Sequence, residues 1–189
     1  MSGMKRVYLD HAAATPMHPK VKQAMEPFFE DVFYNPSALY TGAREAKEAL
    51  ESARHTVAKT IGARPAEIVF TAGGPESANL AIDGVMSAYP EAEVITSTIE
   101  HEAVLRAAEK HTHHLAPVDA KGRLILAELE SLITEKTALI SVMLVNNEVG
   151  TIQPIKEVVE LTKRINQERK KSGNTVPLYV HTDACQAPL

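Results

Sequence analysis

Apolar positions along the chain follow two patterns, a helical spacing and a continuous run. Over residues 43–61 they recur every three or four positions, the spacing of one helix face. The members of this stripe are Ala46, Leu50, Ala53, Val57 and Ile61. Gly62 follows directly, where helices commonly end. Residues 138–145, in contrast, are apolar almost throughout, as expected for a strand buried on both faces of a sheet.

The remaining elements follow from the same patterns. Helices are predicted over residues 19–31, 75–88, 102–111, 126–133 and 154–165. Short strands are predicted over residues 68–70, 94–96, 115–118 and 178–180. Strands that alternate with helices indicate an α/β domain with a mostly parallel sheet, wrapped by helices on both faces. Ligands bind such sheets at the carboxyl ends of the strands, so the residues that follow each strand are the candidate site.

Composition excludes several classes of function. The chain has 189 residues, about one domain in length, and its 44% hydrophobic and 23% charged residues are typical of a globular protein. A net charge of −4 argues against direct nucleic-acid binding, and no apolar run is long enough for a membrane span. Cys185 is the only cysteine, and no apolar stretch follows Lys5 and Arg6 as in a signal peptide. These features predict a cytoplasmic protein.

Two strand ends carry residues with two interpretations each. After residues 68–70 come Gly73 and Gly74 at the start of a predicted helix, where backbone N–H groups can bind a phosphate. The same glycines also suit a tight turn without a ligand. After residues 94–96 comes His101, which suits ring stacking or proton transfer, although a lone histidine there is more often a helix cap or a surface residue.

Two further strand ends also allow two interpretations each, and at residues 146–151 the turn is favoured when that segment is taken alone. Residues 146–151 offer two amides and a carboxylate that could orient a polar ligand, although Asn and Gly also favour turns. Asp183 could pair with a protonated ring nitrogen or cap a helix. Taken together, the four strand ends favour a ligand site over turns and caps. A phosphate cradle, a flat imidazole, an amide and a carboxylate are the contacts that pyridoxal 5'-phosphate (PLP) needs.

Several segments also resemble those of a known family, in order and in spacing. They are residues 7–16, 35–37, 67–71, 76–79, 100–101, 145–150 and 181–186. Together they resemble the class V aminotransferase-fold enzymes, and in particular the cysteine desulfurases of the NifS/IscS group. The sequence Asn-Asn-Glu-Val-Gly at 146–150 favours that group over the relatives of SufS and the selenocysteine lyases.

The resemblance implies a fold, an activity and partners. It implies the type I fold of PLP-dependent transferases, with residues 1–15 as an N-terminal segment and 16–189 as an incomplete large domain. The small C-terminal domain is absent from the sequence. Family members are homodimers that convert L-cysteine to L-alanine. They pass the sulfur, as a persulfide, to acceptors such as an iron–sulfur scaffold or a tRNA-thiolating protein.

The resemblance also assigns roles to individual residues. His101 is expected to stack on the PLP ring and to shuttle protons, and Asp183 to pair with the pyridine nitrogen. Gln186 is expected to bond the phenolic oxygen, with Asn147 near that oxygen and the substrate carboxylate. The remaining assignments are the backbone of Gly74 and Pro75 at the phosphate, and Ala12, Ala13 and Asn35 at the edge of the substrate pocket.

Two departures from the family pattern change these expectations. Pro75 replaces a common Thr and provides neither an N–H nor a hydroxyl, which should weaken phosphate binding by about 1–3 kcal/mol. The family's Ser-x-His-Lys element, which carries the Schiff-base lysine, and its persulfide cysteine do not occur in the 189 residues. Cys185 is instead expected to be a buried, inert residue. The chain is therefore expected to be the N-terminal half of a desulfurase, inactive alone.

Other interpretations remain open at this point. The cofactor contacts also fit another class V aminotransferase or a kynureninase-like lyase. A non-catalytic half-protein that binds a full-length homolog is a further alternative. Residues 111–114 contain three histidines, but a solvated helix end is expected there and no metal site. A solvated helix end is also expected for the basic residues Arg164, Arg169, Lys170 and Lys171.

Overall fold

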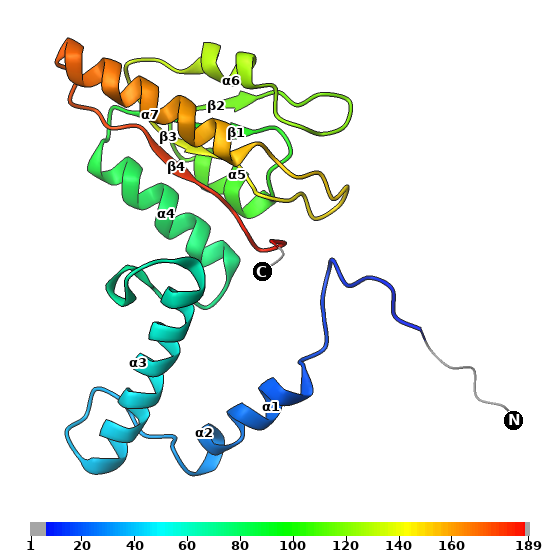
Figure 1. The fold of residues 1–189 in the computed structure, drawn as a ribbon, viewed down its shortest axis with the longest axis vertical. Coiled ribbons are helices and arrows are strands. Elements are labelled where there is room, and N and C mark those ends of the chain that lie inside the picture. Colours follow the sequence, from blue (N-terminus) through cyan, green and yellow to red (C-terminus); the bar gives the residue numbers. More distant parts are fainter. Residues whose placement is uncertain (1–6, 188–189) are drawn as a thin grey trace, which may run out of the picture. The chain divides into compact units, whose positions relative to one another are not determined.

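The computed structural model describes residues 7–187, which divide after Phe70 into two compact units (Figure 1). The first unit is helical. Its elements are α1 (Pro19–Met25), α2 (Pro27–Glu30), α3 (Thr41–Ile61) and the short 3-10 helix η1 (Pro65–Glu67). Among residues 7–187, no helix combines the length and the apolar character that a bilayer span requires.

The first unit corrects one predicted helix and confirms another. The helix expected over 19–31 is divided at Glu26, because Pro27 has no N–H with which to continue the hydrogen bonds of α1. Helix α3 is confirmed and begins two residues earlier than expected. It ends where predicted, since Gly62 adopts the left-handed conformation, with a φ of 70°.

The strand predicted over residues 68–70 is wrong. No strand is assigned there, and the side chain of Val69 is 65% exposed. The carbonyl of Ile68 accepts a hydrogen bond from the Arg54 guanidinium at 2.6 Å, and the same guanidinium lies 4.9 Å from the centre of the Phe70 ring. A side chain of α3 therefore satisfies a backbone group that a neighbouring strand would bond in a sheet.

The second unit alternates helices and strands, as the apolar pattern predicts. Its elements are α4 (Gly74–Ala88), β1 (Glu93–Ser97), α5 (Glu102–Ala108), β2 (His113–Ala116), α6 (Leu126–Leu132), β3 (Thr137–Ser141), α7 (Ile155–Ser172) and β4 (Tyr179–His181). The four strands form one parallel sheet in the order β2-β1-β3-β4. The predicted α/β fold with a parallel sheet is therefore confirmed.

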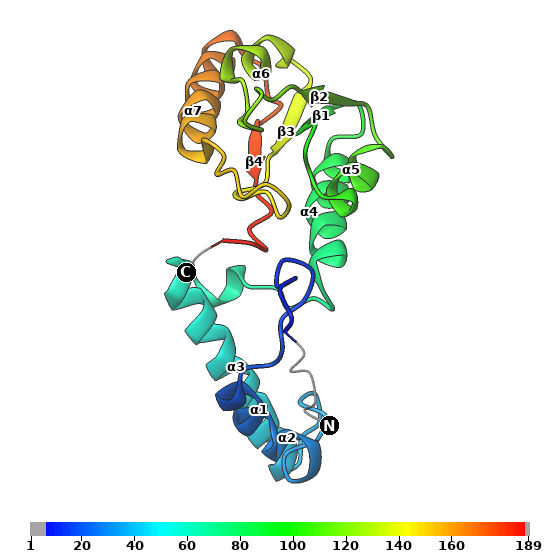
Figure 2. The ribbon, with the colours of Figure 1, turned by 90° about the vertical axis from the view of Figure 1, so that its right-hand side faces the viewer.

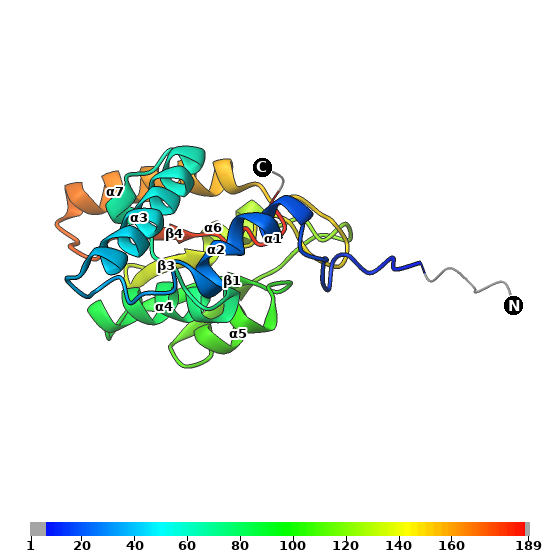
Figure 3. The ribbon, with the colours of Figure 1, turned by 90° about the horizontal axis from the view of Figure 1, so that it is seen from below.

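Two hydrophobic cores lie on opposite faces of this sheet. One packs α4 and α5 against the sheet through side chains such as Ile82 and Val104. The other packs α6 and α7 against the opposite face through side chains such as Leu129 and Val158. Figures 2 and 3 show the strands between these helical layers. The sheet is thus covered on both faces, which explains the nearly continuous apolar run in β3.

Strand β3 is shorter than the run 138–145 that predicted it. Its partner β4 has three residues, and the last register pair is Ser141 with His181. Beyond that pair the backbones remain bonded, since Val142 N–H donates to the His181 carbonyl and Leu144 N–H to the Asp183 carbonyl. The residues after β3 therefore stay attached to the residues after β4, although they are no longer a regular strand.

Two expected helix ends are corrected. Helix α5 stops at Ala108, so His113 and His114 lie in β2 and not at a helix end. Arg169 is not solvated, because it is 6% exposed and its guanidinium donates to three backbone carbonyls. The acceptors are Thr137 O and Val176 O at 2.9 Å and Thr134 O at 2.6 Å. The other three basic residues of this stretch are exposed, as predicted.

Candidate cofactor-binding site

A cavity of about 470 Å³ lies at the carboxyl end of the sheet in the second unit. One wall is the start of α4 and the other is the segment that follows β4. Its lining includes Gly74 and Asp183, which the resemblance assigned to the cofactor. The complete lining is Thr71, Gly73, Gly74, Ser77, Ala78, His181, Thr182, Asp183, Ala184 and Cys185.

The start of α4 presents hydrogen-bond donors to this cavity. Gly73 is the N-cap and Gly74 the first helical residue, whose N–H has no acceptor within the helix. The hydroxyls of Thr71 and Ser77 lie 2.6 Å apart in the same wall. Because a helix N-terminus also carries a partial positive charge, this wall is suited to an anion.

Pro75 removes one possible hydrogen-bond donor from this wall, but other donors remain. Pro75 contributes no N–H, as expected from the sequence. The hydroxyls of Thr71 and Ser77 also line the cavity, and neither was predicted from the sequence. A hydroxyl one helical turn after the N-cap was the signal that could have identified Ser77.

Asp183 forms the acidic part of the opposite wall. Its backbone carbonyl accepts the N–H of Leu144 at 2.8 Å, which holds the residue against the end of β3. Its carboxylate oxygen Oδ1 accepts the N–H of Cys185 at 2.9 Å. Nearby His181 places Nδ1 2.8 Å from the Ser141 hydroxyl, and burial lowers the pKa of His181 below its ordinary value. The Asp183 carboxylate is thus the acidic group of this wall.

Cys185 is exposed, contrary to the expectation that it would be buried. Strand β4 ends at His181, so Cys185 lies in the turn beyond it and not on a covered strand. Its Sγ would lie 3.3 Å from a Cβ added to Gly74, so glycine there allows the close approach of the two walls. A hydrogen bond to Asp183 is the main cause that raises the pKa of the Cys185 thiol to about 11. This pKa favours the protonated thiol at neutral pH, and the expected inertness of Cys185 stays a prediction.

The donors and acceptors of the cavity fit PLP. N–H and hydroxyl groups on one wall suit a phosphate, and a carboxylate on the other suits a protonated pyridine nitrogen. Both groups lie at strand ends of one sheet, where the fold class places its ligands.

The other predicted cofactor residues lie outside the cavity lining. His101 is the N-cap of α5, and its Nδ1 accepts the N–H of Ala103 at 3.1 Å. Asn147 is half-buried in the loop after β3, and Gln186 is exposed after β4. The capping interpretation of His101 is confirmed, whereas the cofactor roles of these three residues stay predictions.

Three of the predicted substrate residues, Ala12, Ala13 and Asn35, belong to the first unit. Ala12 and Ala13 lie in a turn, where the N–H of Ala13 donates to the Asp10 carbonyl at 3.2 Å. Asn35 is exposed, and its Oδ1 accepts the N–H of Ser37 at 2.9 Å. Their roles at a substrate pocket stay predictions.

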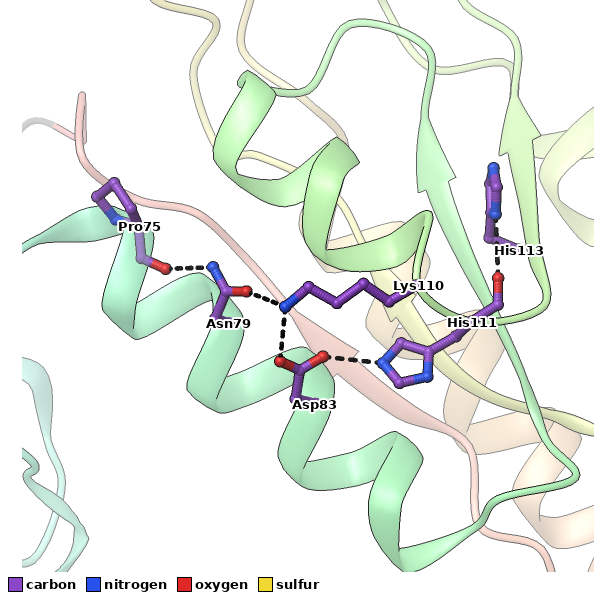
Figure 4. Close-up of polar contacts among 6 residues, drawn as sticks. All are labelled: Pro75, Asn79, Asp83, Lys110, His111 and His113. Carbon is purple, nitrogen blue, oxygen red and sulfur yellow. Dashed lines mark hydrogen bonds and ion pairs between the residues drawn. The ribbon is translucent and has the colours of Figure 1, made fainter.

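A polar network on the outer face of α4 joins this helix to the end of α5 (Figure 4). Asn79 Nδ2 donates to the Pro75 carbonyl at 2.7 Å, and Lys110 Nζ donates to Asn79 Oδ1 at 2.6 Å. Asp83 accepts from Lys110 at 3.0 Å and lies 2.8 Å from His111 Nε2. The helix that carries Gly74 is therefore tied to its neighbour along its outer face.

Replacing Asp83 by asparagine should lower the free energy of unfolding by about 0.5–1 kcal/mol at pH 7, since the pair is partly exposed. The hydrogen bond from His111 is the main cause that holds the pKa of Asp83 below its ordinary value of 3.8. The stabilisation that ionised Asp83 provides is complete above pH 3.8, and it is lost as the pH falls through the lower pKa that Asp83 has in the folded state. Urea unfolding at pH 7 and pH 3 should show the difference shrinking. Asp31→Asn is the exposed control, and an equal loss at both pH values would contradict the ion pair.

Comparisons with known proteins place this chain in a family. The family model described as "Aminotransferase class-V" matches residues 7–187. The chain therefore belongs to the class V aminotransferase family, whose members include the PLP-dependent cysteine desulfurases.

The relatives narrow the resemblance to the cysteine desulfurases. "Cysteine desulfurase IscS" of Dictyoglomus turgidum and "Cysteine desulfurase NifS" of Azotobacter vinelandii are each 42% identical to this chain over 97% of it. The solved structure of a "NifS-like protein" matches with a TM-score of 0.88 and 35% identity, covering 97% of this chain and 50% of that one. The chain spans about half the length of the relatives, 46% and 45% of the two desulfurases. The predicted resemblance to the NifS/IscS group is confirmed.

Proposed function

We propose that this protein is a PLP-dependent cysteine desulfurase that takes sulfur from L-cysteine and leaves L-alanine. The observation that carries the proposal is the single cavity that joins the anion-binding start of α4 to the Asp183 carboxylate. The 42% identity to IscS and NifS supports the choice of reaction. The proposal includes a homodimer, a cytoplasmic location and a sulfur acceptor such as an iron–sulfur scaffold or a tRNA-thiolating protein.

Each residue of the site has a defined task in this proposal. When bound, PLP supplies an electron sink for negative charge at the substrate carbon. Asp183 holds the proton on the pyridine nitrogen, and the Gly74 N–H with the Ser77 hydroxyl binds the phosphate. His101 covers the ring and moves a proton at Nε2. The neutral ring carries its proton at Nε2, because Nδ1 accepts the N–H of Ala103.

Replacing Asp183 by asparagine should weaken PLP binding about 10- to 100-fold. A hydrogen bond to a charged group is worth about 1.5–3 kcal/mol, and about 1.4 kcal/mol corresponds to tenfold in affinity. Titration of the purified chain with PLP, followed by absorbance, measures the effect. Asp31→Asn, an exposed change at the C-cap of α2, is the matched control. Equal affinity of the Asp183 variant and the wild type would contradict the proposed site.

The chain of 189 residues is expected to bind PLP without releasing alanine from cysteine. Its sequence contains no Ser-x-His-Lys element, so the lysine that the family uses for covalent capture is not among these residues. Amino-acid analysis after incubation with L-cysteine and PLP tests this expectation. Alanine above the level of a PLP-only control would show that the assignment of the missing lysine is mistaken.

A further inference from the structure

Two loops of the second unit exchange buried side chains at the carboxyl end of the sheet. Glu100, in the loop after β1, accepts the backbone N–H of Met143 with Oε1 at 2.9 Å. Asn146, in the loop after β3, donates from Nδ2 to the Ile99 carbonyl at 3.1 Å. Each loop thus gives one side chain to the backbone of the other. We call this reciprocal pair, Glu100 and Asn146, the loop clasp.

Both members of the loop clasp are buried and also bond within their own loops. Glu100 is 6% exposed and Asn146 is 8% exposed. Glu100 Oε1 accepts a second hydrogen bond from the Ser97 hydroxyl. Asn146 Oδ1 accepts the N–H groups of Glu148 and Val149, each at 2.9 Å. The loop clasp therefore fixes the course of each loop as well as the contact between them.

The second oxygen of Glu100 distinguishes this carboxyl group from an ordinary structural one. Oε2 is buried and has no hydrogen-bond partner within the described residues 7–187. An ionised carboxylate with such an oxygen is costly, whereas a protonated carboxyl group carries no charge. Burial is the main cause that raises the pKa of Glu100 to about 7, against the hydrogen bonds from Ser97 and Met143.

A neighbouring charge also raises the pKa of Glu100. Asp183, which follows β4, faces Glu100 with a negative charge that further raises its pKa. His181 on β4 cannot offset that charge, because its own burial lowers its pKa and keeps the ring neutral. His101, next in sequence to Glu100, is exposed and engaged at Nδ1 as a helix cap.

We propose that Glu100 and Asn146 are positioning residues, which act through the loop clasp to hold the neighbouring His101 and Asn147 at the cofactor site, with Glu100 working as an uncharged acid. The geometry carries this assignment, because the two clasp residues directly precede the two residues to be placed. The cofactor part of the inference rests on the proposed function. The clasp itself does not, so the two can be tested separately.

Amide hydrogen exchange on the full chain without PLP tests the coupling of the loops. Glu100→Ala should speed exchange about five- to tenfold at the amides of Glu148 and Val149, which bond Asn146 and not Glu100. Asn146→Ala should do the same at Met143, which bonds Glu100. Glu100→Gln keeps an acceptor and an uncharged donor, so its rates should stay within about twofold of the wild type. Faster exchange confined to the directly bonded amides would overturn the clasp.

The pH dependence of unfolding tests the uncharged state and also serves if Glu100→Ala does not fold. A folded pKa of about 7 lies above the ordinary value of 4.5, so the folded state holds a proton that the unfolded state releases. Between pH 5 and 7 the wild-type unfolding constant should therefore rise about five- to sevenfold per pH unit relative to that of Glu100→Gln. The difference between the two proteins cancels His181, which both contain. Glu102→Gln, an exposed change in α5, is the matched control. Parallel pH curves for wild type and Glu100→Gln would overturn the uncharged acid.

PLP titration of the same variants separates the two proposals. Asn146→Ala should bind PLP about tenfold more weakly than the wild type, and Glu100→Gln within about twofold of it. Wild-type affinity in Asn146→Ala, despite faster exchange in the loops, would overturn the positioning role. If the wild-type chain itself does not bind PLP, the proposed function fails, and the exchange and pH experiments still decide the loop clasp.

Discussion

Replacing Arg169 by methionine is expected to lower the free energy of unfolding by about 3–5 kcal/mol. The guanidinium is buried and bonds the carbonyls of Thr134, Thr137 and Val176, which belong to two separate places on the chain. Methionine fills part of the volume but removes all three hydrogen bonds, and the Thr134 carbonyl keeps the N–H of Thr137 at 3.3 Å. Each unsatisfied buried group costs about 1–3 kcal/mol, and partial entry of water reduces the sum. Urea unfolding, followed by circular dichroism, measures the loss.

Arg164→Met is the matched control for this prediction. Arg164 lies on the same helix, but half of its side chain is exposed and its partners are the carboxylates of Glu130 and Glu168. Exposed ion pairs contribute about 0–1 kcal/mol, so this variant should lose less than about 1 kcal/mol. Comparable losses in the two variants would show that the backbone contacts of Arg169 do not stabilise the fold.

Replacing Asp183 by asparagine is expected to speed alkylation of Cys185 about tenfold at pH 7.5. The hydrogen bond to Asp183 is the main cause that raises the thiol pKa from 9.0 to about 11, which lowers the thiolate fraction about 100-fold. A more basic thiolate is also a better nucleophile, and this recovers about half of the effect on a logarithmic scale. Mass spectrometry after timed exposure to iodoacetamide measures the rate, since Cys185 is the only cysteine.

Two controls accompany the alkylation experiment. Cys185→Ser should show no modification, which confirms the site of reaction. Asp31→Asn should react at the wild-type rate, because this exposed residue lies in the first unit. If the wild-type thiol already reacts as fast as cysteine in a short peptide, the contact with the Asp183 carboxylate does not persist in solution.

The second unit could be predicted from the sequence because its sheet is buried on both faces. Apolar runs such as Val94–Thr96 and Ala138–Ile140 then mark the strands directly, and the helices between them show a clear stripe. The first unit was harder. The general rule for proline could have predicted the division at Pro27. The absence of a strand at residues 68–70, in contrast, depends on Arg54, which lies fourteen positions before the Ile68 carbonyl that it bonds.

The candidate site shows the same division between local and distant information. Gly74 and Asp183 could be found because each lies at a strand end or helix start that the pattern defines. Arg169, which lies outside the site, could not be predicted to be buried. Basic residues near a helix end are normally solvated, and only the carbonyls around Arg169 reveal its burial. The same holds for Glu100, whose acidic side chain is buried by contacts 43 positions away. Long-range contacts of single polar side chains leave no periodic trace in a sequence.

The alternation of side chains in β1 limits how the chain can tolerate change in length. Val94 belongs to the core beneath α4 and α5, and the next residue, Ile95, belongs to the core beneath α6 and α7. An inserted residue in this strand would exchange the two side chains between the layers and disrupt both at once. It would also rotate the loop beyond Ser97. Insertions and deletions should therefore be accepted in surface turns such as 119–123 and rejected within β1.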